Sequence, residues 1–479
     1  MTVAARIGII ALLVITLAIP IAAVVVLTGW VAEAHDDAES LDARFVAAAP
    51  ADLASAPTPA LSTRRIPDEL VEPQADRALA TRLTQLVAEQ PGPSCLVVEV
   101  DGRPIIAHQT TTALIPASVM KVVTAVAVLD HIGPEERFAT RLVTDAPVVD
   151  GVVQGDLWMV GGGDPVLATP DYAAALSRPQ ARTPFEELAV QLAGAGITAV
   201  DGRILADDLR YDQDREVDAW PSRYVDEGSV GPLSALSVDD GRERSGDDYE
   251  PSGDPPRTAA ESLDAALEAA GIQVNGGEGR AAPAPLEPQV LVEVTSPPVA
   301  EIIQQMLQES DNNTAELLVK ELGLRLGGAG TTEAGAAVVR QSLEQRGLDI
   351  AQFAVVDGSG LARENLQSCQ TLETLLDESS PGTVVADGLA VAGRSGTLTN
   401  RYGDSPLAGV LRAKTGSLNE VATLAGIVPT AAGLINFAQL LNGLPLDDEA
   451  GTTLQDRLVE ILATWPERPD PDQVAPSGS

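Results

Sequence analysis

The sequence has few residues of several chemically useful kinds. Its 479 residues include three histidines and two cysteines, and no HExxH stretch occurs. This scarcity argues against a zinc site built from Cys and His. A Ser-His-Asp triad would need His108 or His131, because His35 lies in a linker-like segment. Aromatic residues make up 3% of the chain, so its core must consist mainly of Ala, Val, Leu and Ile.

Basic residues are also scarce. The chain has 31 Lys and Arg against 69 Asp and Glu, a formal net charge of -38. We exclude a general nucleic-acid binder, because no basic face could form against that background. Only Lys121, Lys320 and Lys414 are lysines. Lysine can lose its proton when buried whereas arginine cannot, so the few lysines are candidates for chemistry.

The N-terminal segment predicts a membrane anchor. Residues 7–32 carry no charge and could cross a bilayer as a helix. We expect residues 1–33 to be a cytoplasmic stub and transmembrane signal-anchor, which places the protein in the cell membrane with its catalytic body outside the cytoplasm. A signal peptide cleaved near residues 32–34 is the alternative. Residues 34–73, rich in Ala, Pro and Asp, and residues 466–479 predict a disordered linker and a disordered tail.

The remaining chain alternates helical and strand-like patterns. Helical patterns cover 74–90, 118–132, 299–307, 314–326 and 452–464. Strand-like patterns cover 95–100, 104–108, 410–414, 421–428 and 434–442, with a turn expected at 415–420. Unlike material lies between, including a long acidic loop at 239–257. We therefore expect an α/β (α+β) catalytic domain of residues 74–149 and 290–465, interrupted by an inserted α/β domain of residues 150–289.

Ser118 and Lys121 form an S-x-x-K pattern at the start of the most apolar helix. Residues three apart share a helix face, so the Lys121 amine can lie beside the Ser118 hydroxyl. A hydroxyl becomes an effective nucleophile when a nearby base removes its proton. Burial lowers a lysine pKa and makes the amine such a base. A Ser cap with a solvent-exposed Lys is the plain structural alternative.

Two further patterns follow in order. Lys414, Thr415 and Gly416 lie at a strand end, where a fixed ammonium can bind a substrate carboxylate and Gly416 permits close approach of a ligand. Ser310 and Asn312 lie between two helices and could present a hydroxyl and an amide to a cleft, although the same sequence also caps helices. Lys320 fits a surface or bundle-edge position.

The set S-x-x-K, S-x-N and K-T-G resembles the penicillin-recognising acyl-serine transferases. More closely, the chain resembles the D-alanyl-D-alanine carboxypeptidase/endopeptidase family, the class C low-molecular-mass penicillin-binding proteins of peptidase family S13. The stretches that carry this resemblance are Ile115–Lys121, Gly155–Pro165, Leu233–Asp240, Ser310–Glu316, Asp357–Leu361, Gly396–Leu398 and Lys414–Leu418. The resemblance implies a penicillin-binding-protein/serine β-lactamase-like fold with a large insertion, and no metal or organic cofactor.

The resemblance also implies substrates and roles. The substrates would be peptidoglycan stem peptides, and β-lactam antibiotics would be covalent inhibitors. Ser118 would attack the bond between two D-alanines with Lys121 as base. Ser310 and Lys414 would pass the proton to the leaving group, and Asn312 would hold the peptide backbone. Lys414 with Thr415 would bind the terminal carboxylate, and the N–H groups of Ser118 and Ser417 would form the oxyanion hole.

Other assignments remain open at this stage. Asp239 and Arg363 are candidates for reading a diaminopimelate side chain, one for its amine and one for its carboxylate. Cys95 and Cys369 are candidates for a disulfide, with two buried thiols as the alternative. A serine β-lactamase or esterase on the same fold, or a non-catalytic cell-wall-binding protein, are the competing functions.

Overall fold

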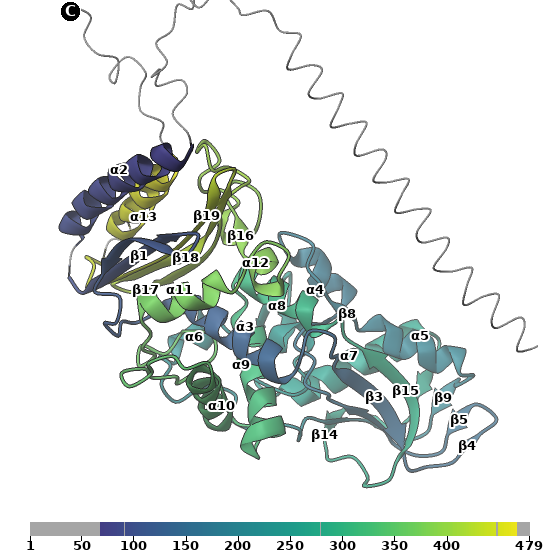
Figure 1. The fold of residues 1–479 in the computed structure, drawn as a ribbon. Coiled ribbons are helices and arrows are strands. Elements are labelled where there is room, and N and C mark those ends of the chain that lie inside the picture. Colours follow the sequence, from purple (N-terminus) through teal and green to yellow (C-terminus); the bar gives the residue numbers. More distant parts are fainter. Residues whose placement is uncertain (1–67, 91, 278, 447–448, 467–479) are drawn as a thin grey trace, which may run out of the picture. The chain divides into compact units, whose positions relative to one another are not determined.

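A six-stranded antiparallel sheet organises the catalytic part of the molecule (Figure 1). The computed structural model describes residues 68–90, 92–277, 279–446 and 449–466. The strands, in their order across the sheet, are β16 (Ala390–Val391), β17 (Arg412–Leu418), β18 (Val421–Thr430), β19 (Gly433–Asn442), β1 (Ser94–Val100) and β2 (Arg103–His108). Strands from the two ends of the chain therefore lie side by side in the sheet. β1 pairs with β19, which in turn pairs with β18, although β1 precedes both by more than 300 residues.

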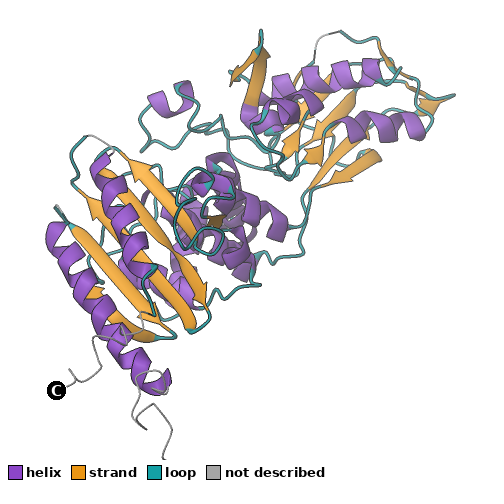
Figure 2. Ribbon diagram, turned by 90° about the horizontal axis from the view of Figure 1, so that it is seen from above, coloured by secondary structure: helices purple, strands orange, loops and turns teal. Residues whose placement is uncertain are grey.

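The two faces of this sheet pack against different helices (Figure 2). Alternating side chains of a strand point to opposite faces. In β1, Leu96 and Val98 join the core formed with α2 (Asp68–Glu89) and α13 (Glu449–Leu462). Cys95 and Val97 instead join the core on the other face. The sheet is thus the middle layer between a two-helix layer and a larger helical layer.

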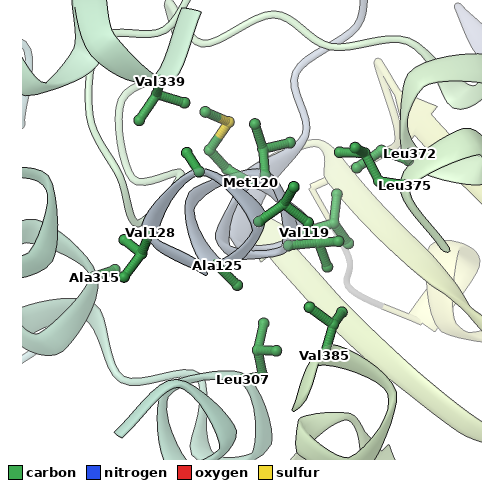
Figure 3. Packing of buried hydrophobic residues seen from close by; sticks show 14 of the residues in the cluster. Val119, Met120, Ala125, Val128, Leu307, Ala315, Val339, Leu372, Leu375 and Val385 are labelled. Carbon is green, nitrogen blue, oxygen red and sulfur yellow. The ribbon is translucent and has the colours of Figure 1, made fainter. Parts of the chain in front are cut away.

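Helix α3 (Met120–His131) runs through the middle of the larger layer. Its residues 120–128 are all buried, as its nearly uninterrupted apolar sequence requires. Figure 3 shows side chains of neighbouring helices surrounding it, including Leu307, Ala315 and Leu372. The surrounding helices are α8 (Val299–Glu309), α9 (Asn312–Leu322), α10 (Thr332–Gln345), α11 (Cys369–Asp377) and α12 (Val384–Gly388). A helix held on all sides fixes the residues at its first turn.

A second sheet lies in the central part of the sequence. Its order is β14 (Arg280–Ala281), β10 (Ile204–Asp207), β6 (Leu157–Val160), β3 (Ala139–Thr144) and β15 (Gln289–Thr295). The β10 strand pairs in parallel with β6 and β14, whereas β3 and β15 pair antiparallel. Helices α5 (Glu186–Gly194) and α7 (Pro255–Ala269) share its apolar core.

The remaining elements of the central part are short. They comprise a four-stranded sheet of β4 (Val148–Val149), β5 (Val152–Val153), β9 (Ala199–Val200) and β13 (Gln273–Val274), the pairs β7 (Leu167–Ala168) with β8 (Thr183–Pro184) and β11 (Arg242–Ser245) with β12 (Asp248–Pro251), and helices α4 (Pro170–Ala175) and α6 (Arg223–Asp226). The boundaries at 150 and 289 remain predictions. The second sheet also includes β3 and β15. β3 pairs antiparallel with β6, and β15 pairs antiparallel with β3 at the edge of the sheet.

Most expected elements are present, with three differences. The segment 68–73, expected as linker, is the start of α2. The expected turn at 415–420 shortens to Asn419 and Glu420, since β17 continues to Leu418 and pairs with β18 along its length. The expected acidic loop contains the β11–β12 hairpin.

The predicted anchor at 1–33, linker residues 34–67 and tail residues 467–479 lie outside the described residues. Within the part of the chain that is described, none of the helices has the length and apolar character needed to cross a membrane.

Candidate active site

Ser118 lies in a short 3-10 turn, Ala117–Val119, that leads directly into α3. Ala117 has a φ of 47°, in the left-handed region that non-glycine residues rarely adopt. Such strained backbone concentrates at functional sites, where the surrounding fold holds it in place. Gly360 supports it, since a Cβ there would lie 1.9 Å from the Ala117 carbonyl oxygen. The serine is thus presented at the N-terminal end of a fully packed helix.

Strand β17 passes close to this turn. At Gly416, an added Cβ would lie 2.9 Å from the Ser118 nitrogen and 2.2 Å from Thr423 Oγ1. Thr423 also donates to the Pro116 carbonyl at 2.8 Å, which ties the turn to the sheet. A cavity of about 430 Å³ opens here, and Ser118, Ser310, Thr415, Gly416 and Ser417 all line it. Residues from the three sequence patterns therefore share one cavity.

The Lys121 amine is completely buried beside the serine. Its Nζ lies 3.3 Å from Ser118 Oγ, 2.5 Å from Asn312 Oδ1 and 2.7 Å from the Ser359 carbonyl oxygen. Burial lowers the pKa of Lys121 to about 8, although the charges of Glu316, Asp357 and Asp311 oppose that shift. Burial of an ammonium is costly, so the neutral amine is accessible close to neutral pH.

The three contacts of Lys121 define how a neutral amine must point. A neutral amine has two N–H donors and one lone pair. The Asn312 and Ser359 oxygens are both carbonyl acceptors, so they take the two N–H bonds. The remaining direction faces Ser118 Oγ, where the lone pair can receive the hydroxyl proton. This geometry supports a general base acting on a serine nucleophile.

The S-D-N segment connects α8 to α9. Ser310 ends α8 in a left-handed conformation, with a φ of 62°. Asp311 caps α9 by accepting from the Thr314 N–H and hydroxyl. Asn312, the first residue of α9, donates to the Ser229 carbonyl at 2.6 Å through Nδ2. Its amide is therefore held from both ends, between the central part of the chain and Lys121.

Lys414 is fully buried in β17. Burial, together with the charge of Lys121, places the pKa of Lys414 well below its ordinary value. Its Nζ donates to the Thr415 carbonyl at 2.9 Å, and the Thr415 hydroxyl donates to Thr397 Oγ1 at 2.8 Å. The neighbouring charge of Lys121 thus adds to burial in lowering the proton affinity of Lys414.

Two buried carboxyl groups behind Lys121 were not predicted. Glu316 accepts from the N–H groups of Gly358 and Ser359, and Asp357 accepts from the indole of Trp220 at 2.8 Å. Burial and the charge of Asp357 raise the pKa of Glu316 to about 8, and hydrogen bonds from Ser359 and Gly358 counteract part of that rise. The sequence spacing could have indicated Glu316, because it follows Asn312 by four residues and therefore shares its helix face.

Lys320 continues the same face of α9 and is buried, not at a surface or bundle edge as expected. Only 1% of the residue is exposed, and its Nζ lies 2.5 Å from Asp212 Oδ1. The expectation was wrong because the first residues after β10 cover this end of α9. An ion pair accounts for the lysine.

Asp239 and Arg363 lie in different surroundings. Asp239 lines another cavity, beside Tyr249, and accepts from the N–H and hydroxyl of Thr169. Burial raises the pKa of Asp239 to about 6, against the effect of the Thr169 bonds. Arg363 donates to the Asn419 carbonyl and lies 3.6 Å from a Glu420 oxygen, beside the Ser118 cavity. Asp239 therefore lines a cavity other than the one that Ser118 lines, and the predicted roles of Asp239 and Arg363 both stay predictions.

Cys95 and Cys369 are joined as a disulfide, which links β1 to the first residue of α11. Both sulfur-bearing residues are completely buried in the core around α3. The two-thiol alternative does not apply to this structure.

The chain is similar to known proteins over the region that contains these motifs. The sequence pattern of the D-Ala-D-Ala carboxypeptidase 3 (S13) family matches residues 78–248 and 250–465. The chain belongs to this family.

Individual relatives of this S13 peptidase support the same family assignment, because they are named carboxypeptidases. A D-alanyl-D-alanine carboxypeptidase from an Actinomadura species is 30% identical, over 81% of this chain and 86% of the relative. A carboxypeptidase from Mycolicibacterium smegmatis is 31% identical over 72% of this chain and 75% of the relative. The family predicted from the motifs is confirmed.

A solved structure gives the same fold. Penicillin binding protein 4 from Haemophilus influenzae superposes with a TM-score of 0.64 at 20% identity, covering 79% of this chain and 98% of that protein. This confirms the mixed α/β fold expected for the S13 peptidase, whereas the expected transmembrane helix lies outside the described residues.

Proposed function

We propose that this S13 peptidase is a serine D-alanyl-D-alanine carboxypeptidase with DD-endopeptidase activity. It cleaves the terminal D-Ala-D-Ala bond and the cross-links of peptidoglycan stem peptides through an acyl-serine intermediate, and penicillin inhibits it. The observation that carries the proposal is the Lys121 amine, whose two carbonyl partners leave its third direction facing Ser118 Oγ. The carboxypeptidase names of the sequence relatives support the substrate class.

Acylation begins with proton transfer from Ser118 to Lys121. The Ser118 oxygen then attacks the carbonyl carbon between the two D-alanines, and negative charge develops on the carbonyl oxygen. The backbone N–H groups of Ser118 and Ser417 receive that charge, since β17 and the 3-10 turn approach each other at Gly416. A donor of this kind typically lowers the barrier by about 2.7–4 kcal/mol.

Departure of the D-alanine requires a proton on its nitrogen. The Ser310 hydroxyl and the Lys414 amine are the groups we assign to this transfer. They pass the proton that Lys121 took from Ser118 to the leaving nitrogen, which returns Lys121 to its neutral form. Because Lys414 has a low proton affinity, it passes a proton on and does not retain it, as a relay requires. Thr415 receives the terminal carboxylate, while Asn312 combines contact with the peptide with its hold on Lys121.

Water completes the cycle by attacking the acyl-enzyme. In penicillin the leaving nitrogen stays tethered to the acyl group after ring opening, which slows this second step. The buried Glu316 has no exposed surface, and the N–H groups that it binds face away from water. A carboxylate in that position gives no rapid deacylation, which favours a peptidase over a β-lactamase.

Intact-mass measurement with benzylpenicillin tests the function. We expect one long-lived penicilloyl adduct on the native protein and none on Ser118→Ala, together with release of D-alanine from a D-Ala-D-Ala stem peptide. Ser417→Ala retains the backbone N–H and is the matched control, which should still be labelled. Absence of an adduct on the native protein would support a non-catalytic wall-binding protein, and rapid nitrocefin turnover would support a β-lactamase.

The location of the enzyme is part of the proposal. The uncharged segment 7–32 supports a single membrane anchor with the catalytic body on the cell-wall side, and a disulfide is typical of that compartment. Membrane fractions washed with alkaline carbonate should retain the full chain and release a chain that begins at Asp68.

A further inference from the structure

Glu316 is a fully buried carboxyl group to which the reaction described above assigns no task. It lies one turn after Asn312 in α9, on the face that meets α3. A buried carboxyl is costly unless its surroundings compensate for the lost water. The contacts of Glu316 must therefore offset this cost, and they can serve either the stability of the fold or the reaction.

The contacts of Glu316 lead to the general base through a single residue. Its Oε1 accepts from the Ser359 N–H at 2.7 Å and from the Gly358 N–H at 3.1 Å. The carbonyl of the same Ser359 accepts from Lys121 Nζ at 2.7 Å. Glu316 and Lys121 thus hold Ser359 at its two backbone polar groups, so movement of the carboxyl would displace the carbonyl that orients the amine.

The other charges around Lys121 have partners of their own. From α9, Asp311 caps the helix through Thr314. From the loop after α10, Asp357 binds the N–H groups of Gly360 and Ala362. From β17, Lys414 donates to the Thr415 carbonyl, and the charge of Lys121 lowers its pKa. Glu316 exerts the largest effect of these acids on Lys121, and it raises that pKa.

We propose that Glu316 is a positioning residue for Lys121: its carboxyl oxygens hold the Gly358–Ser359 backbone against the amine, and its negative charge lies behind that amine when the carboxyl is ionised. This inference rests on the proposed function, because it assigns Lys121 the role of base. The substitution Glu316→Gln keeps the size of the side chain, removes the charge and replaces one accepting oxygen by a donor that faces the Gly358 N–H.

The pH dependence of acylation by benzylpenicillin tests the proposal. In Glu316→Gln the ammonium form of Lys121 loses stabilisation, so the acidic limb of the rate profile should move to lower pH by about one unit. The rate at the plateau should fall at least about tenfold, because the new amide donor faces the Gly358 N–H and displaces the Gly358–Ser359 backbone that orients the amine. A residue with only a structural role would lower the amount of folded enzyme and leave the limb in place.

Glu321→Gln is the matched control. Glu321 lies on the same helix and is equally buried, but it pairs with Arg210 and Arg325. Its substitution should leave the limb unchanged in the protein that remains folded. Glu316→Asp, which keeps the charge but shortens the reach, should slow acylation about tenfold with the limb within a few tenths of a unit of the native value.

Two results would overturn the proposal. One is an unmoved limb in folded Glu316→Gln. The other, which decides the case if Glu316→Gln does not fold, is a native acylation rate in Glu316→Asp. A native protein that penicillin does not label would instead contradict the proposed function itself, so the two failures are distinguishable.

Discussion

Each end of helix α9 carries a buried glutamate, and the surroundings shift the pKa values of these two residues in opposite directions. Glu316, near the start, has backbone N–H groups as partners, and its pKa rises to about 8 through burial and the charge of Asp357. Glu321, near the end, is just as buried, but hydrogen bonds from Arg210 and Arg325 outweigh burial and lower its pKa.

The difference shows what separates a structural acid from one that can influence chemistry. Arginine keeps its proton and fixes its partner as a permanent anion. An acid without arginine stays sensitive to its neighbours, and here Asp357 raises the pKa of Glu316 while Glu316 itself acts on the base. In this lysine-poor chain the two ends also hold a lysine each, Lys121 against the first turn of α9 and Lys320 near its last turn.

The largest test exchanges each lysine for arginine. Lys121→Arg should lower the acylation rate by about 10³-fold or more, because a guanidinium cannot accept the Ser118 proton. Lys320→Arg keeps a cation beside Asp212 and should change that rate by less than about threefold. Stopped-flow measurement with a fluorescent penicillin distinguishes them, and equal losses in both variants would remove the contrast between the two ends.

The next effect concerns stability at the arginine-paired end. Glu321→Gln leaves Arg210 and Arg325 without their anion, and we expect about 2–3 kcal/mol of destabilisation, reduced from the value for a fully buried pair because both arginines are about one-third exposed. Denaturant unfolding measures the loss. An unchanged midpoint would mean that solvent compensates the two arginines fully.

The smallest test needs no mutation. Lys121 has a pKa of about 8, so its neutral form becomes about tenfold rarer for each pH unit below that value. Acylation should therefore rise with pH up to about 8 and then level off. A profile that is flat from pH 6 to 8 would mean that the amine is already neutral or is not the base.

Local patterns were sufficient for part of this site. The apolar run after Ser118 fixes a buried helix, and the three-residue spacing to Lys121 fixes their common face, so both are predictable. The hairpin of β17 and β18 follows from alternating residues, although the strand's extension through Gly416 depends on pairing with a neighbour. The β3 and β15 strands joined the second sheet for a similar reason, since edge pairing is decided by the partner strand.

The rest of the site depends on contacts between distant segments. Glu316 and Lys320 share the helix face of Asn312, but whether that face meets solvent or protein is decided by the Asp357–Leu361 loop and by the residues after β10. Asp239 could not be placed from its neighbours, because Thr169 lies 70 residues away in sequence. The role of a polar residue on a helix can be predicted only when the segments that pack against that residue are known.

The cross-link between Cys95 and Cys369 joins residues with a sequence separation of 274 and so closes a large covalent ring. The solvent-exposed β11–β12 hairpin lies inside that ring. A protease cut at Gly246 would leave one fragment with the nucleophile and base and another with the remaining motifs, yet the two would stay covalently attached. Such a nicked enzyme should migrate as one species without reductant and as two with it, while keeping its ability to bind penicillin.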